Sequence, residues 1–189
     1  MQKDKAVIQL HKPDASEMMF FFLCGVVISV PLTLFIYQYS NTLMAGLDPL
    51  IAAFIASAIF APFVEEFAKA YPLFYRHGET ERSIFSLALL VGIGFAIVEL
   101  ATYVSALGVP VTTRLPGLLF HPASTSITAY GVATKRPLPY YLMAVFLHFS
   151  YNYLVLTSPI GLSGAVFVMT LTVLSSWQLR KKTKEKIVI

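Results

Sequence analysis

Between Pro137 and Gln178 the chain contains no Asp, Glu, Lys or Arg, which is far more apolar sequence than one core helix of a soluble protein uses. A helix needs roughly 20 apolar residues to cross the hydrocarbon of a bilayer, so this stretch is long enough for two crossings. A Pro/Gly turn signal at 157–161 predicts the break between them. Charged residues make up 13% of the 189-residue chain, about half their share in soluble domains. The chain is therefore predicted to be a membrane protein.

Four further apolar stretches precede this one, and each is long enough for a helix that crosses or nearly crosses the bilayer. They are 18–39, 49–75, 83–107 and 115–134. The first lacks a small-residue cleavage site, so we expect a retained helix and not a signal peptide. The sequence predicts an all-α bundle of six transmembrane helices. Its predicted parts are an N-terminal segment (1–17), the helical domain (18–179) and a basic tail (180–189).

The basic residues favour one orientation of this bundle in the membrane. If both termini are cytoplasmic, the inside segments hold twelve Lys and Arg residues, whereas the outside loops hold only Arg114. Such an asymmetry is typical of bacterial-type membrane proteins with short loops. Five of the twelve follow an apolar run at the end of the chain, where they indicate a membrane face more than a nucleic-acid surface. We therefore expect cytoplasmic termini, a lipid bilayer around the helices, and no nucleic-acid partner.

Ionisable side chains interrupt the predicted spans. They are Glu65, Glu66, Lys69, Glu99, His121 and His148. An ionised group at the bilayer centre costs at least about 2.5–3.5 kcal/mol, and the accumulated penalty favours a functional site over structural ion pairs that only fix the packing. With a rise of about 1.5 Å per residue, all six fall near the middle of the membrane. One shared site is therefore feasible.

The types and spacing of these residues suit hydrolysis. Two adjacent carboxylates in a low dielectric cannot easily both ionise, which suits a general acid or base that works near neutral pH. Lys69 could keep one of the two ionised, and Asn152, one turn after His148, could donate to a developing oxyanion. Histidine and glutamate together could also hold zinc with a water in the fourth position, although no H-E-x-x-H motif is present. Pro62 removes a backbone hydrogen bond just before the paired glutamates, and either opens the helix to water or kinks it.

Four short motifs, in order, resemble those of PrsW-type intramembrane proteases. The segment 61–69 (APFVEEFAK) resembles the E-E-x-x-K motif, and 94–99 (GFAIVE) resembles the second motif. The third is matched by Arg114, His121, Thr125 and Gly131, and the H-x-x-x-N fourth by His148 and Asn152. The resemblance covers about half of the chain. It implies cleavage of a membrane-anchored protein or peptide, such as an anti-sigma factor, in a prokaryotic cytoplasmic membrane.

The resemblance also implies roles for the residues. Glu65 would be the general base for water, tuned by Glu66 and Lys69, and Asn152 would stabilise the oxyanion. A zinc ion would be held, or a water oriented without metal, by Glu99, His121 and His148. The related type II CAAX prenyl endopeptidases carry E-E-x-x-x-R and F-x-x-x-H, whereas Lys69 here comes one place earlier and Glu99 replaces the histidine. These departures favour the PrsW branch, although Leu100 stands where that branch often has Asn.

Other functions stay open at this point. A proton- or cation-coupled transporter could use the same buried carboxylates as a relay, although no inverted repeat is visible in the sequence. A CAAX-type endopeptidase would share the chemistry but act on prenylated proteins. A non-catalytic scaffold would use the polar cluster only to specify helix packing.

Overall fold

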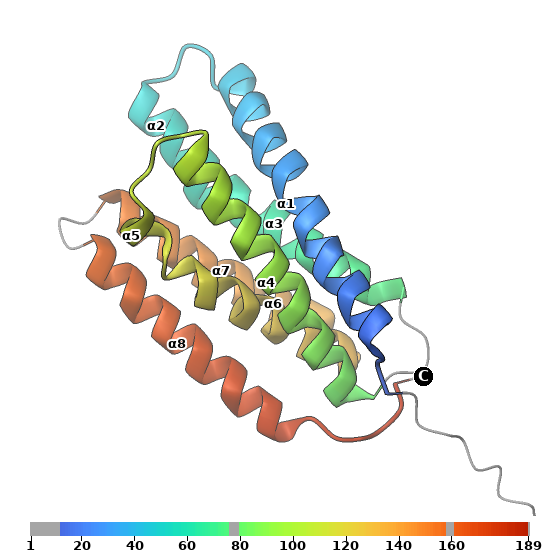
Figure 1. Ribbon diagram of the computed structural model, residues 1–189. Helices are drawn as coiled ribbons and strands as arrows, with labels where there is room; N and C mark the ends of the chain where they lie inside the picture. Colours follow the sequence, from blue (N-terminus) through green and yellow to red (C-terminus); the bar gives the residue numbers. More distant parts are fainter. Residues whose placement is uncertain (1–11, 76–79, 158–160, 189) are drawn as a thin grey trace, which may run out of the picture.

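The computed structural model describes residues 12–75, 80–157 and 161–188, which form a bundle of long helices (Figure 1). Five long helices are uninterrupted: α1 (Ala15–Leu43), α4 (Glu81–Ser105), α6 (Gly117–Ala133), α7 (Pro137–Thr157) and α8 (Gly161–Lys182). A sixth long helix is continuous but changes its hydrogen-bond pattern along its length. Its parts are α2 (Pro49–Phe54), the π-helix η1 (Ile55–Phe60), α3 (Ala61–Ala70) and the 3₁₀-helix η2 (Tyr71–Tyr75). A single turn, α5 (Val111–Arg114), connects α4 to α6.

Four of the described helices are long and apolar enough to cross a membrane: α1, the continuous helix Pro49–Tyr75, α4 and α8. Helices α6 and α7 are not among them. Helix α6 has 17 residues, nearly all buried among neighbouring helices, and α7 carries the polar side chains of His148 and Asn152. The predicted helical membrane bundle is thus confirmed, whereas six crossings stays a prediction.

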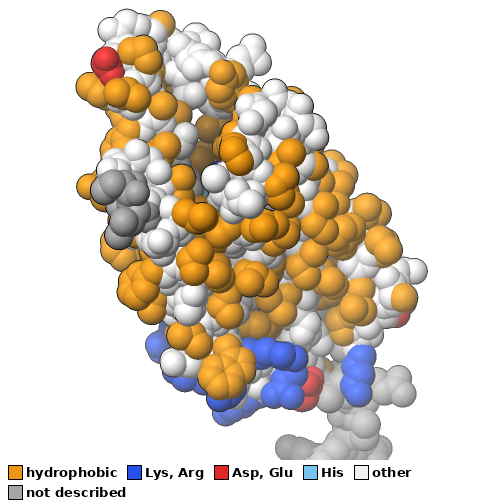
Figure 2. Space-filling model, turned by 60° about the vertical axis from the view of Figure 1, so that its left-hand side comes forward, with side chains coloured by type: hydrophobic (Ala, Val, Ile, Leu, Met, Phe, Trp, Pro, Cys, Tyr) orange, Lys and Arg blue, Asp and Glu red, His pale blue; other side chains and the backbone are white. Residues whose placement is uncertain are grey.

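The surface of the bundle changes character from its middle to one end. Large apolar side chains such as Phe35, Phe146 and Phe167 are exposed around the middle, as lipid contact requires. Lys and Arg side chains gather where α1 begins and α8 ends, here named the basic end (Figure 2). Both described ends of the chain therefore lie on one side of the bundle. This agrees with an even number of crossings, and the cytoplasmic location of that side stays a prediction.

Part of the orientation prediction falls outside the described residues. This holds for Lys3, Lys5 and Arg76, and for residues 158–160 of the predicted break. The described part of the basic tail folds back over the start of α4. There the N–H of Glu81 donates to the carbonyl of Lys186, and that of Arg82 to the carbonyl of Lys184. The tail therefore packs on the basic end of the bundle.

Helix α4 lies at the centre of the bundle, and glycines let α1 approach it backbone to backbone. A Cβ atom added to Gly25 would lie 2.0 Å from the carbonyl oxygen of Val91, and one added to Gly94 would lie 2.2 Å from that of Phe22. Small residues are the usual means of close helix contact in lipid, where dispersion and not the hydrophobic effect holds helices together. This contact fixes the depth and rotation of α4, which carries Glu99.

We expect Gly94→Val to destabilise the bundle by about 1–3 kcal/mol or more, because the added methyl groups overlap the backbone of α1. Thermal unfolding in detergent measures the effect. Ala101→Val on the exposed face of the same helix is the matched control, and we expect it to unfold like the wild type. Equal stability of the two variants would contradict the close α1–α4 contact.

Candidate active site

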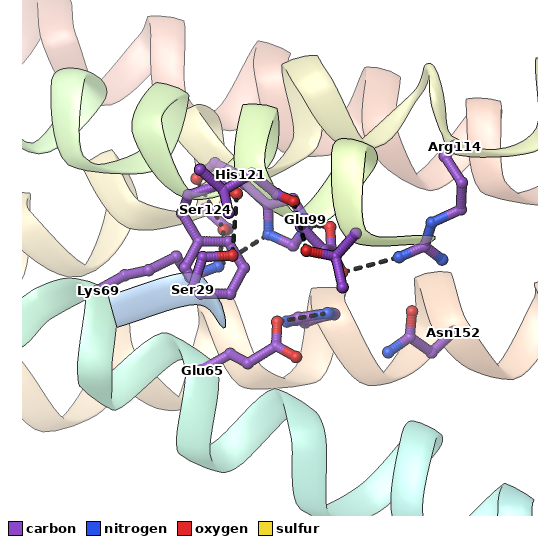
Figure 3. Close-up of polar contacts among 12 residues, drawn as sticks. Ser29, Glu65, Lys69, Glu99, Arg114, His121, Ser124 and Asn152 are labelled. Carbon is purple, nitrogen blue, oxygen red and sulfur yellow. Dashed lines mark hydrogen bonds and ion pairs between the residues drawn. The ribbon is translucent and has the colours of Figure 1, made fainter. Parts of the chain in front are cut away.

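The six ionisable residues singled out in the sequence come together between α3, α4, α6 and α7 (Figure 3). Each of them is buried, with a relative exposure of 6% or less. Helical spacing explains how one helix contributes several of them, since residues three or four apart share a face. The charged side chains therefore face one another inside the bundle and not the lipid.

Lys69 is the cation at the centre of the cluster. Its Nζ donates to Glu66 Oε1 at 2.6 Å and lies 2.9 Å from His121 Nδ1, and the ring of Phe95 lies 4.9 Å away. Both Lys69 and Glu66 are fully buried, so their opposite charges compensate each other where water is excluded. Ser124 adds a hydroxyl 3.1 Å from Glu66 Oε1.

His148 lies between the two adjacent glutamates. Its Nδ1 lies 2.9 Å from Glu66 Oε1, and its Nε2 lies 3.8 Å from Glu65 Oε2. Among the described residues, this oxygen of Glu65 is buried and has no hydrogen-bond partner. A buried carboxylate oxygen normally has a partner, and here the neighbouring side chains supply none. The position suits a water, a substrate group or a cation next to His148.

Glu99 is held on both of its oxygens. Arg114 Nη2 donates to Oε1 at 2.7 Å, and His121 Nε2 lies 2.7 Å from Oε2. The guanidinium of Arg114 also stacks on the ring of Tyr103, 3.6 Å from its centre. Arg114 therefore reaches into the site from α5, at the end of the bundle opposite the basic end. The sequence signalled it as the single basic residue of the predicted outside loops and as a position of the third motif.

Three ligand atoms in this cluster are close enough to share one metal ion. They belong to Glu65, His121 and His148, and lie within 4.8 Å of one another. One carboxylate and two imidazoles form a donor set that zinc accepts while leaving a position for water. The orphaned oxygen of Glu65 supports such a partner. Glu99 of the predicted metal set contacts the imidazole of His121 instead, in the way that a carboxylate supports a ligating histidine, and its own ligation stays a prediction.

A cavity of about 270 Å³ leads to the cluster from the end opposite the basic end. Its inner end is polar, where Glu65, Glu99, Arg114 and Asn152 point toward one another (Figure 3). Its walls are mainly apolar and include Leu34 on α1, Tyr103 on α4 and Leu156 on α7. Asn152 Nδ2 donates to the backbone carbonyl of Ser57 on η1 at 2.7 Å.

Some contacts were not anticipated from the sequence. Ser124 contacts both Glu66 and the backbone carbonyl of His121, and its position three residues after His121 was the available signal. Thr125, from the third motif, donates its hydroxyl to the carbonyl of His121. Gly131, near the end of α6, lies against the side chain of Tyr140 on α7 and takes no part in the cluster.

Comparison with known proteins agrees with this geometry. The family model described as PrsW family intramembrane metalloprotease matches residues 14–177. The chain belongs to this family. No curated protein and no solved structure was found to match it. The PrsW resemblance inferred from four short motifs is therefore confirmed over most of the chain. The protein is an integral membrane protein and an intramembrane protease, a class that acts on substrates within the lipid environment.

We expect the PrsW-family cluster to depend on its central ion pair. Lys69→Met leaves the fully buried Glu66 without its cation, which should destabilise the protein by about 3–5 kcal/mol. The double variant Lys69→Met/Glu66→Gln removes both charges and should recover part of that loss, as measured by thermal unfolding in detergent. A double variant that is less stable than Lys69→Met alone would show that the two charges do not compensate each other.

Proposed function

We propose that the protein hydrolyses a peptide bond in a membrane-anchored protein with a water activated by Glu65. The observation that carries this proposal is the unpartnered Oε2 of Glu65, buried beside His148 at the end of a cavity. A carboxylate without competing donors is a suitable acceptor for the proton of an attacking water. Oε2 of Glu66 also lacks a partner, but Glu66 is bonded to Lys69 through its other oxygen and Glu99 is bonded to Arg114. Glu65 therefore differs from both in lacking an ion pair with Lys or Arg, and it lines the cavity.

In the proposed reaction, the water oxygen bonds to the peptide carbonyl carbon while Glu65 takes one of the water protons. The tetrahedral intermediate then breaks its C–N bond, and the proton passes from Glu65 to the leaving nitrogen. Asn152 uses one N–H of its amide for Ser57, and the second N–H is available to the developing oxyanion. His148, held at Nδ1 by Glu66, keeps its Nε2 toward Glu65 and the water.

The donor set also fits the metal that the family description implies. Glu65, His121 and His148 would hold the ion, and zinc in this place would supply Lewis-acid activation of the water. Glu66 fixes the ring of His148 through Nδ1 and leaves its Nε2 for the ion. Both nitrogens of His121 contact side chains, Lys69 at Nδ1 and Glu99 at Nε2, so ligation by His121 would replace one of these contacts and keep the other as its support. Such outer contacts set the orientation of ligating imidazoles.

The cavity suggests how a substrate reaches the site. Its apolar walls suit the side chains of an unwound transmembrane segment, and its polar inner end suits the exposed peptide group. The cavity lies away from the basic end, so in the proposed orientation it opens toward the non-cytoplasmic half of a prokaryotic cytoplasmic membrane. In that orientation six helices cross the bilayer and both termini are cytoplasmic, which the twelve-to-one distribution of basic residues supports.

We expect the purified protein, reconstituted in lipid vesicles, to cleave a single-span substrate. Glu65→Gln and His148→Ala should lower kcat by about 10³-fold or more, because each removes part of the group that activates the water. Glu17→Gln, at the start of α1 and far from the cavity, is the control and should retain wild-type cleavage. Gel analysis of the products with mass spectrometry measures the rates. Wild-type rates in both site variants would refute the assignment.

Metal content tests the proposed donor set separately. We expect about one zinc ion per chain in the purified wild type and little in His121→Ala/His148→Ala, since the double variant has lost two of three ligands. Elemental analysis of folded protein gives the answer without an activity assay. Full cleavage by a wild-type preparation from which chelation has removed all metal would instead favour the metal-free reaction with Glu65 alone.

A further inference from the structure

The helix that carries the two glutamates contains a π-turn just before them. In η1 the hydrogen-bond pattern widens, and the N–H of Ala61 bonds to the carbonyl of Ala56, five residues back. In an α-helix the same N–H would bond to the carbonyl of Ser57, four residues back. The π-turn therefore leaves the carbonyl of Ser57 without the backbone N–H that would donate to it in an α-helix.

The residue after Ala61 cannot supply the carbonyl of Ser57 with another backbone N–H. Continuing the π pattern by one position would pair the carbonyl of Ser57 with the N–H of residue 62, but that residue is Pro62 and has no N–H. The carbonyl of Ser57 is thus free on the inner side of the helix. Asn152 Nδ2 donates to it at 2.7 Å. A second contact joins the same two helices, since the rings of Phe54 and Tyr153 lie with their centres 5.9 Å apart.

The bond determines where the amide of Asn152 lies. Asn152, Ser57 and Glu65 all line the same cavity, so the bond holds the amide in the space where the proposed reaction places the substrate carbonyl. The extra residue of the π-turn also rotates α2 by about 100° relative to α3. Without it, a different carbonyl would face Asn152 while Glu65 faced His148.

We propose that Pro62 is a positioning residue for the peptidase reaction. By lacking an N–H, it keeps the carbonyl of Ser57 available to Asn152 and so aims the amide at the oxyanion. The inference rests on the proposed function, since it assumes that Asn152 contacts the reacting carbonyl. This role differs from that of a proline that only bends a helix, because the effect of Pro62 on the rate depends on the hydrogen bond from Asn152 to the carbonyl of Ser57.

A double-mutant cycle tests this route. Pro62→Ala supplies an N–H that competes for the carbonyl of Ser57, and we expect kcat to fall by about 10- to 100-fold with KM within about twofold of wild type. In an Asn152→Ala background the same change should cost nothing further, because the side chain it positions is gone. Pro31→Ala, which removes the proline inside α1, is the matched control and should cleave like the wild type.

Several outcomes would overturn the inference. A Pro62→Ala variant with wild-type kcat would do so, as would one that loses the same factor with and without Asn152. If the alanine variant does not accumulate, Pro62→Ser supplies the same N–H and replaces it in the cycle. Failure of both variants to fold would make Pro62 a folding residue and would also overturn the positioning role. Wild-type cleavage by Asn152→Ala would locate the failure in the proposed function, since the oxyanion role of Asn152 would then be lost.

Discussion

The cost of placing charge inside a bilayer determines how the acidic side chains of this site are paired. Glu66 is compensated by Lys69 at 2.6 Å, and Glu99 by Arg114 at 2.7 Å. Glu65 has only the imidazole of His148, at 3.8 Å. Buried charges are tolerated when they are paired, and an unpaired one is costly enough to indicate a function. The two cations of the cluster are paired with Glu66 and Glu99, and Glu65 is the acid that we propose for activating the water.

This distribution of charge depends on backbone contacts made elsewhere in the bundle. Glu99 can meet both Arg114 and His121 only if α4 has the right depth, and the glycine contacts with α1 set that depth. Helix α6, which carries His121, is covered by its neighbours over most of its length, so it tolerates serines and threonines that bond to their own backbone.

Sequence patterns predicted the helices well where the apolar runs were long. The predicted spans 49–75 and 83–107 correspond closely to the continuous helix Pro49–Tyr75 and to α4. Burial of the six ionisable residues in one cluster also followed from depth and spacing. Which atoms pair did not, because helical spacing fixes the face of a residue but not the rotation of the facing helix. The contact of Arg114 with Glu99, and the proximity of Glu65 to the two imidazoles, required the structure.

The placement of the cavity relative to the charges bears on the reaction that such a site can support. Hydrolysis needs water on only one side of the cluster, whereas an ion-coupled transporter must expose its carboxylates to each side in turn. Between the cluster and the basic end lie Leu73, Ile84 and Val91, all with no exposure to solvent. The approach from the opposite end is hollow and ends at Glu65. A site that is open on one side and filled on the other lets water meet a peptide bond while the membrane stays sealed.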